Sequence, residues 1–303
     1  MKLNILFLFF ISVTTAAPAS SSERDVTITK YVDSSPTSYD WTNGWVRSFP
    51  IHKSCNDTEY NQLSSAFIEV QKLAAHAKDH TLRFGNESKF YKKYFGNSPT
   101  AEVVGWYENI VSADKTNVLF RCDDPDGNCE LDGWAGHWRG ENGTNENVIC
   151  ELSFKTRRWL SQLCSQGYTV AGSKNSIFWA GDLLHRIWHT DSFGYEVVGH
   201  YADTYDECLE LAKKNSTLAV RNSATLRYYA LDVYAYDISI PGKGCTGDSH
   251  KASNGNEHSQ LNSSTNEESR SQSTVASQSL KSEEGSKGGS ECHTHASGET
   301  HCV

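Results

Sequence analysis

The chain has 303 residues, of which 37% are hydrophobic and 11% aromatic, so it can form a packed core in one sizeable domain with tails or in two small domains. The formal net charge is −9, and the basic residues do not cluster. This charge balance argues against nucleic acid or an anionic membrane surface as the main partner.

The N-terminus has the pattern of a secretory signal peptide. Lys2 precedes an apolar run over 5–11, and small alanines follow at Ala16, Ala17 and Ala19. The run is shorter than the roughly 20 residues of a membrane-spanning helix, and no second long apolar run follows. We predict that residues 1–17 are removed and that the mature protein is secreted, extracellular, and associated with the cell wall or cell surface.

Glycosylation sequons and cysteines agree with export. Nine cysteines fit a disulfide framework, and the odd number leaves one over. Cys208, in a helical pattern, is our candidate for the free thiol, and Cys122 and Cys129 are expected to form a bridge across a local turn. Sequons for glycosylation begin at Asn56, Asn86, Asn142, Asn215 and Asn262.

Composition divides the mature chain into three parts. Residues 18–247 have the apolar content of a globular domain, whereas residues 248–290 are rich in Ser, Asn, Glu, Lys and Gly. The second segment cannot bury enough apolar surface to fold, so we expect a disordered linker. The last residues, 291–303, form a separate tail rich in Cys and His.

The periodicity of the globular part predicts an α+β fold that is mainly α-helical. Short strands are expected in the sequences NVLFRC, WAGHWR and NVICELSF, which surround turn sequences and would form a small antiparallel sheet. The aromatic run over 227–237 has helical spacing and is interpreted as core rather than as a binding surface. Apolar spacing predicts helices over 59–81, 153–164, 177–190, 197–214 and 223–237.

Three histidines suggest a metal site. His185 and His189 are four residues apart, so on a helix both imidazoles can reach one ion. A turn at Gly194 and Gly199 would bring His200 back toward them. A fourth side chain, Asp203, can bind the metal or hold a histidine N–H. Three histidines with an open fourth position are typical of zinc.

Arg186 distinguishes this helix from the zinc helix of a metallopeptidase. In the H-E-x-x-H motif a glutamate deprotonates the metal-bound water, and a guanidinium cannot do so. We expect Arg186 to pair with Asp182 on the side of the helix away from the metal. An alternative base, Glu196 or Glu207 from the following segment, would restore catalysis if it came close to the metal.

Two further histidine groups have alternative interpretations. His76 and His80 also have a four-residue spacing; hydrogen bonding to backbone or carboxylate is the favoured interpretation and a second metal site the alternative. In the tail, a disulfide between its two cysteines would tie the histidines into a ring, and the reduced tail would form a Cys/His zinc site. The candidate tail ligands are Cys292, His293, His295, His301 and Cys302.

Several specific sequences occur along the chain: HRIWH, GHYADTYDECLELA, SYDWTNGWV, HAKDHTLRFG, KKYFGN, CDDPDGNC, WAGHWRG and the tail CHTHASGETHC. Together they resemble the fungal pH-regulated antigen family, which consists of secreted zinc-scavenging proteins called zincophores. More distantly, the cysteine motif, the His-x-x-x-His helix and the tyrosine-rich helix resemble deuterolysin-type zinc peptidases, which keep the glutamate and use an aspartate as third ligand.

The resemblance implies a deuterolysin-like fold and a Zn²⁺ carrier that is released under zinc limitation and returns its metal through a cell-surface zinc transporter. It also implies host complement regulators and a leukocyte integrin as partners, with immune evasion and virulence as consequences. Homo-oligomer formation stays open. Because imidazolium does not bind metal, a histidine site should fill at neutral pH and empty in acid.

Three hypotheses therefore compete. The chain is a zinc carrier without catalytic residues, an active secreted metallopeptidase with an unusual base, or a surface adhesin whose zinc is structural. A peptidase needs a carboxylate near the metal-bound water, and a structural zinc needs a fourth protein ligand.

Overall fold

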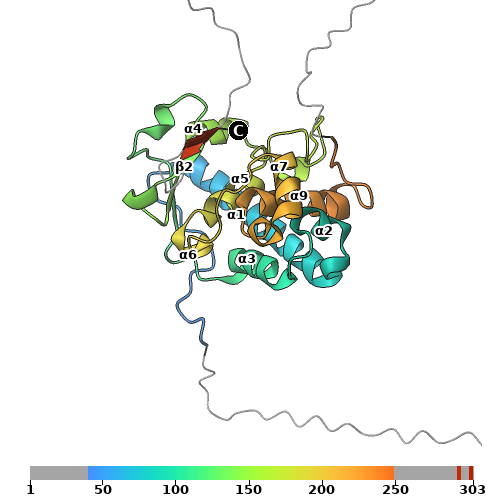
Figure 1. Ribbon diagram of the computed structural model, residues 1–303. Helices are drawn as coiled ribbons and strands as arrows, with labels where there is room; N and C mark the ends of the chain where they lie inside the picture. Colours follow the sequence, from blue (N-terminus) through green and yellow to red (C-terminus); the bar gives the residue numbers. More distant parts are fainter. Residues whose placement is uncertain (1–39, 249–291, 295–299, 303) are drawn as a thin grey trace, which may run out of the picture. The chain divides into compact units, whose positions relative to one another are not determined.

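The computed structural model describes residues 40–248 and two short strands, 292–294 and 300–302 (Figure 1). The chain divides into two units, Met1–Asn43 and Gly44–Val303. In the first, the described residues 40–43 form a turn in which Asp40 accepts hydrogen bonds from Thr42. The expected leader, most of the expected linker, the sequon at Asn262 and His295 lie outside the described residues.

Helix α1 (Asp57–Phe84) is longer at both ends than the expected 59–81. Asn56 and Glu59 form a capping box, in which each side chain accepts a backbone N–H of the other residue. The helix ends at Gly85, whose φ of 49° favours glycine. One face of α1 is fully buried, so this helix forms the centre of the second unit.

The remaining helices follow α1 along the chain, and three of them, α3, α5 and α9, pack against it. Four of them, α2, α3, α6 and α8, were not predicted, although Ser88 caps α2 and apolar residues recur with helical spacing in α3. The remaining helices are α2 (Lys89–Phe95), α3 (Thr100–Ser112), α4 (Glu151–Thr156), α5 (Trp179–Trp188), α6 (Asp191–Gly194), α7 (Tyr205–Lys214), α8 (Ser216–Ala219) and α9 (Ser223–Tyr234), which continues as a π-helix over Ala235–Ser239.

Two expected helices are much shorter than predicted, and α5 is two residues shorter at each end than the expected 177–190. The helix expected over 153–164 ends at Thr156 because Arg157 is extended and Arg158 forms a parallel bridge with Phe178. The helix expected over 197–214 begins only at Tyr205, since residues 197–204 form a loop that pairs with the segment before α9. In both places a tertiary backbone pairing replaces the helical one.

The small sheet has the strand order β1-β3-β2. Its strands are β1 (Leu119–Arg121), β2 (Gly136–Trp138) and β3 (Glu146–Ile149). Strands β2 and β3 are antiparallel as expected, but β1 runs parallel to β3, so the expectation of an antiparallel sheet was wrong for β1. The mainly helical α+β class is confirmed.

In the tail, β4 (Cys292–Thr294) and β5 (Thr300–Cys302) pair antiparallel. Their register places Cys292 opposite Cys302 and His293 opposite His301.

Three disulfides join six of the cysteines in residues 40–248, and the expected Cys122–Cys129 bridge was wrong. Asp124 accepts the backbone N–H groups of residues 128 and 129, and this turn directs Cys129 to the end of β3. Burial raises the pKa of the Cys208 thiol to about 12, and this is the free cysteine of the described residues, as expected. The bridges are Cys55–Cys122, Cys129–Cys150 and Cys164–Cys245.

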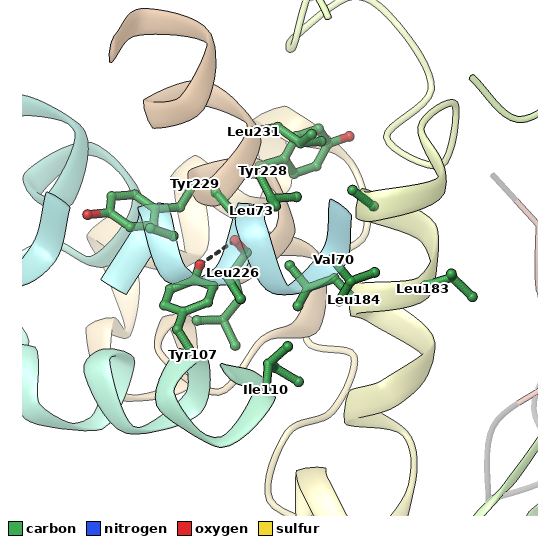
Figure 2. Packing of buried hydrophobic residues seen from close by; sticks show 14 of the residues in the cluster. Val70, Leu73, Tyr107, Ile110, Leu183, Leu184, Leu226, Tyr228, Tyr229 and Leu231 are labelled. Carbon is green, nitrogen blue, oxygen red and sulfur yellow. Dashed lines mark hydrogen bonds between the residues drawn. The ribbon is translucent and has the colours of Figure 1, made fainter. Parts of the chain in front are cut away.

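The core lies where α1 packs against α3, α5 and α9. Figure 2 shows side chains from all four helices meeting there, with Val70 and Leu73 contributed by α1. A buried hydrogen bond from the Tyr107 hydroxyl to the Leu226 carbonyl, 2.6 Å long, links α3 to α9 (Figure 2). The core therefore fixes α5, which carries the candidate site, against α1.

We predict that Leu73→Ala lowers the free energy of unfolding by about 2–5 kcal/mol, because it opens a cavity at a fully buried position. The matched control is Ile68→Ala on the same helix, where the side chain is 69% exposed, and we expect a change within about 0.5 kcal/mol. Urea unfolding followed by circular dichroism measures both. Equal losses in the two variants would contradict this account of the core.

Candidate metal centre

Helix α5 positions the first histidine. All ten residues of this helix are buried, and its start is fixed by the bridge between Arg158 and Phe178. His185 lies in its last turn and is 4% exposed. A helix without a solvent face cannot rotate to release a side chain, so the direction of His185 is set by packing.

The second histidine lies where α5 ends. His189 is the C-cap residue, and its backbone N–H donates to the carbonyl groups of residues 186 and 187. The chain then turns sharply into α6 and packs so closely that a Cβ on Gly194 would lie 1.8 Å from the Trp188 carbonyl oxygen. Only glycine fits there, as the sequence suggested for this turn.

The third histidine is placed by a loop rather than by a helix. Gly199 forms a parallel bridge with Asn222, next to His200. The Asn222 side chain accepts hydrogen bonds from the backbone N–H groups of Tyr201 and Ala202 and donates to the Ala202 carbonyl. This fully buried amide fixes the loop that carries His200.

The three imidazoles converge on one point. The His189 Nε2 atom lies 3.1 Å from Nε2 of His185 and 2.9 Å from Nε2 of His200, and the three ligand nitrogens lie within 4.8 Å of one another. Two nitrogens bound to one tetrahedral zinc at about 2.0–2.1 Å would be roughly 3.3 Å apart. The cluster therefore has the donor type and close to the spacing that a zinc ion requires.

Asp203 sets the tautomer of His200. Its carboxylate oxygen lies 2.5 Å from Nδ1 of His200, and a carboxylate can only accept, so Nδ1 carries the hydrogen. The Nε2 atom of the neutral ring then presents its lone pair to the cluster. Asp203 thus orients and polarises a candidate ligand, which is the second of the two tasks foreseen for it.

Neither of the two glutamates considered as alternative bases belongs to the group of ligand atoms formed by the three histidines. Glu207 accepts the backbone N–H of Thr204 in the capping box of α7, and this bond is the main reason that its pKa is lowered. Glu196 is exposed. Among the described residues, the metal-ligand group here contains three histidines and no carboxylate.

Arg186 forms a buried ion pair, as expected. Its Nε donates to Asp182 at 2.9 Å, and Arg157 contacts the other oxygen of Asp182 at 3.2 Å. The two arginines overcome burial and lower the pKa of Asp182 to about 2. The guanidinium also lies under β2, where a Cβ on Gly136 would come within 3.0 Å of it.

The structure also places the second histidine pair and four of the sequon asparagines. His76 and His80 both face the carboxylate of Asp237, an arrangement that fits hydrogen bonding to a carboxylate and also a group that could hold a metal ion. The sequon asparagines Asn56, Asn86, Asn142 and Asn215 are all exposed. Two further Cys-containing groups hold their cysteines in disulfides.

Sequence reasoning missed two positioning residues, Asn222 and Arg157. Asn222 directly precedes a strong helical pattern, so the sequence could have indicated it as an N-cap residue. In the structure its side chain does not cap α9 but accepts a hydrogen bond from the loop that carries His200. No local pattern pointed to Arg157, because its partner Asp182 is 25 residues away along the chain.

The mainly helical fold brings three histidines together in a group that could hold a metal ion, with Asp203 hydrogen-bonded to one of them. The profile of the family described as "HRXXH: Putative peptidase family" matches residues 3–248. The chain belongs to this family, and Arg186 occupies the R position of the HRXXH motif in the family's name.

Three named fungal proteins are similar to this chain over most of its length. The chain is 60% identical over 245 residues to the pH-regulated antigen PRA1 of Candida albicans, covering 80% of each chain. It is 55% identical to the major allergen Asp f 2 of Aspergillus fumigatus, with 73% and 72% covered. It is 36% identical to the protein ZPS1 of Saccharomyces cerevisiae, with 80% and 96% covered. The resemblance to fungal pH-regulated antigens is confirmed.

Among solved structures, a zinc peptidase from Grifola frondosa is similar with 18% identity and a TM-score of 0.44, covering 59% of this chain and 97% of that one. Within the described residues, no helix combines the length and apolar character needed to cross a membrane.

We predict that Arg186→Met lowers the free energy of unfolding by about 3–5 kcal/mol, because it removes one partner of a buried ion pair. The matched control is Lys155→Met, which breaks the exposed Glu151–Lys155 pair of the same spacing and should change stability by about 0.5 kcal/mol or less. Denaturant unfolding of both variants is the measurement. A similar small effect for both would show that Arg186 is not a structural counter-ion.

Proposed function

We propose that the chain is a secreted zinc carrier whose main site is formed by His185, His189 and His200. The observation that supports this most directly is the convergence of three imidazole nitrogens at a point where the described residues provide no carboxylate. Three neutral nitrogens suit zinc and leave one tetrahedral position for water or for a ligand that exchanges the metal.

The arrangement favours a carrier over a peptidase. A peptidase requires a general base within hydrogen-bond reach of the metal-bound water. Arg186 cannot be that base, and its guanidinium is bonded to Asp182. Glu207 caps α7. We therefore interpret the site as a metallopeptidase centre that has lost its base, and zinc as cargo rather than as a catalyst.

The carrier would be released by the cell, collect extracellular zinc and return it through a cell-surface zinc transporter. Relatives described as a pH-regulated antigen and as a major allergen support exposure to the surroundings of the cell. By the same resemblance, host complement regulators and a leukocyte integrin are proposed partners, and the tail residues 291–303 a proposed accessory zinc site. The exposed sequon asparagines are proposed glycosylation sites.

We predict that the double variant His185→Ala/His189→Ala binds about one zinc fewer per chain than the unchanged protein, because it removes two of three domain ligands. The measurement is elemental analysis after dialysis at about pH 7.5 and about pH 5, since protons compete with zinc for imidazole. We expect the metal to be lost reversibly at the lower pH.

Two controls separate the domain site from the tail. Replacing His293, His295 and His301 by Ala in the full chain should leave the domain zinc bound at the higher pH. His52→Ala changes a histidine that hydrogen-bonds Ser54 and is not part of the cluster, so it should leave the zinc content unchanged. Full zinc content in the His185→Ala/His189→Ala variant would overturn the ligand assignment and move the function to the tail.

We predict that Asp203→Asn weakens zinc binding about 10–100-fold, the usual effect of losing a carboxylate that supports a ligand histidine. The amide keeps the shape but removes the charge that polarises the His200 ring. Titration against a zinc-buffering chelator measures the change. The exposed Asp206→Asn on α7 is the control, and an equal affinity in both variants would exclude this task for Asp203.

The family description favours peptidase activity as the second candidate function. Incubation of the zinc-loaded chain with an unfolded protein substrate, with and without chelator, tests it. Chelator-sensitive cleavage that disappears in His185→Ala would establish a peptidase with an unusual base. An adhesin with structural zinc would instead lose its fold when the metal is removed, whereas a carrier should stay folded.

A further inference from the structure

A second cluster of metal-ligating side chains lies where α1 meets the end of α9. His76 and His80 occupy successive turns of α1. Asp237 comes from the π-helix Ala235–Ser239 that follows α9, 161 residues from His76 along the chain. None of the three belongs to the metal centre described above.

The three side chains meet at one carboxylate oxygen. Oδ2 of Asp237 lies 3.0 Å from Nε2 of His76 and 2.7 Å from Nδ1 of His80. The three ligand atoms lie within 4.8 Å of one another. Both imidazoles therefore direct a nitrogen to the same small volume, as the two histidines of a metal site with two His and one carboxylate do.

The second ring nitrogen of His80 has a hydrogen-bond partner on the side away from Asp237. Nε2 of His80 lies 2.8 Å from the hydroxyl of Ser88, which caps α2 by accepting the N–H of Tyr91. When Nε2 carries the hydrogen and donates it to Ser88, Nδ1 presents a lone pair toward Asp237. Metal-bound histidines commonly have such a partner on their other nitrogen.

Two further features favour a ligand over a purely structural contact. The side chains of His76 and Asp237 are 20% and 23% exposed, whereas His80 is 4% exposed, so an ion can enter from solvent and reach a buried ligand. The carboxylate is delivered by a π-helix, a rare element that is frequent at functional sites.

We propose that His76 Nε2, His80 Nδ1 and the Asp237 carboxylate bind a second divalent transition-metal ion of the zinc type. Two imidazoles and one carboxylate suit zinc, copper or nickel better than calcium or magnesium, which take mainly oxygen ligands. The bound ion joins the C-terminal third of α1 to the π-helix that follows α9. This site is independent of the function proposed for the three-histidine cluster.

The test is zinc content of the full-length protein at a chelator-buffered free zinc concentration. Asp237→Asn and His76→Gln should each lower zinc by about one ion per chain, and should do so equally in a His185→Ala/His189→Ala background. Losses at the two sites should therefore add. The matched control is Asp79→Asn, which changes a 66% exposed carboxylate one position before His80 and should leave zinc content unchanged.

A spectroscopic measurement gives a second readout. Co²⁺ replaces zinc in such sites and absorbs visible light when bound by imidazole and carboxylate. In a background lacking His185, His189 and the three tail histidines, the cobalt absorption should persist and should disappear with Asp237→Asn. Unchanged zinc content and cobalt absorption in folded His76→Gln and Asp237→Asn proteins would overturn the proposal and leave a hydrogen-bonded pair. If Asp237→Asn fails to fold, His76→Gln decides, because it keeps the contact between Asp237 and buried His80.

Discussion

The complete burial of α5 is the constraint on which the rest of the domain depends. A helix without a solvent face stabilises the core through its apolar residues, but every polar side chain on it must find a partner inside the protein. This helix carries Asp182, His185 and Arg186 within five positions. The surrounding elements are arranged so that each of these side chains has such a partner.

The ion pair at Asp182 follows from that constraint. A lone buried carboxylate would be strongly destabilising, and Arg157 and Arg186 compensate its charge on both oxygens. Arg186, the residue after His185, is bonded in this ion pair and covered by β2, so its side chain stabilises the folded domain. A glutamate at that position would add a second buried negative charge beside Asp182, so an arginine there fits the electrostatics of the helix interior.

The local parts of this arrangement could be predicted from the sequence, and the tertiary parts could not. The four-residue spacing of His185 and His189 and the pairing of Arg186 with Asp182 follow from helical geometry. The position of His200 was predicted from glycines, but its loop is fixed by the side chain of Asn222, which no local rule reveals. The parallel pairing of β1 and the disulfide partners likewise depend on contacts between segments that are distant in the chain.

The same histidine spacing occurs in two groups that could hold a metal ion, and the helices that carry them differ in burial. On buried α5 the third donor is another imidazole, and Asp203 acts through His200 from outside the cluster. On α1, which has an exposed face, the third group is the carboxylate of Asp237 itself. Zinc bound by three neutral nitrogens keeps its full double charge, whereas a carboxylate ligand neutralises half of it. The three-histidine centre should therefore attract anionic exchange ligands more strongly and release its metal more readily to an acceptor, and the α1 site should hold its ion as a link between helices.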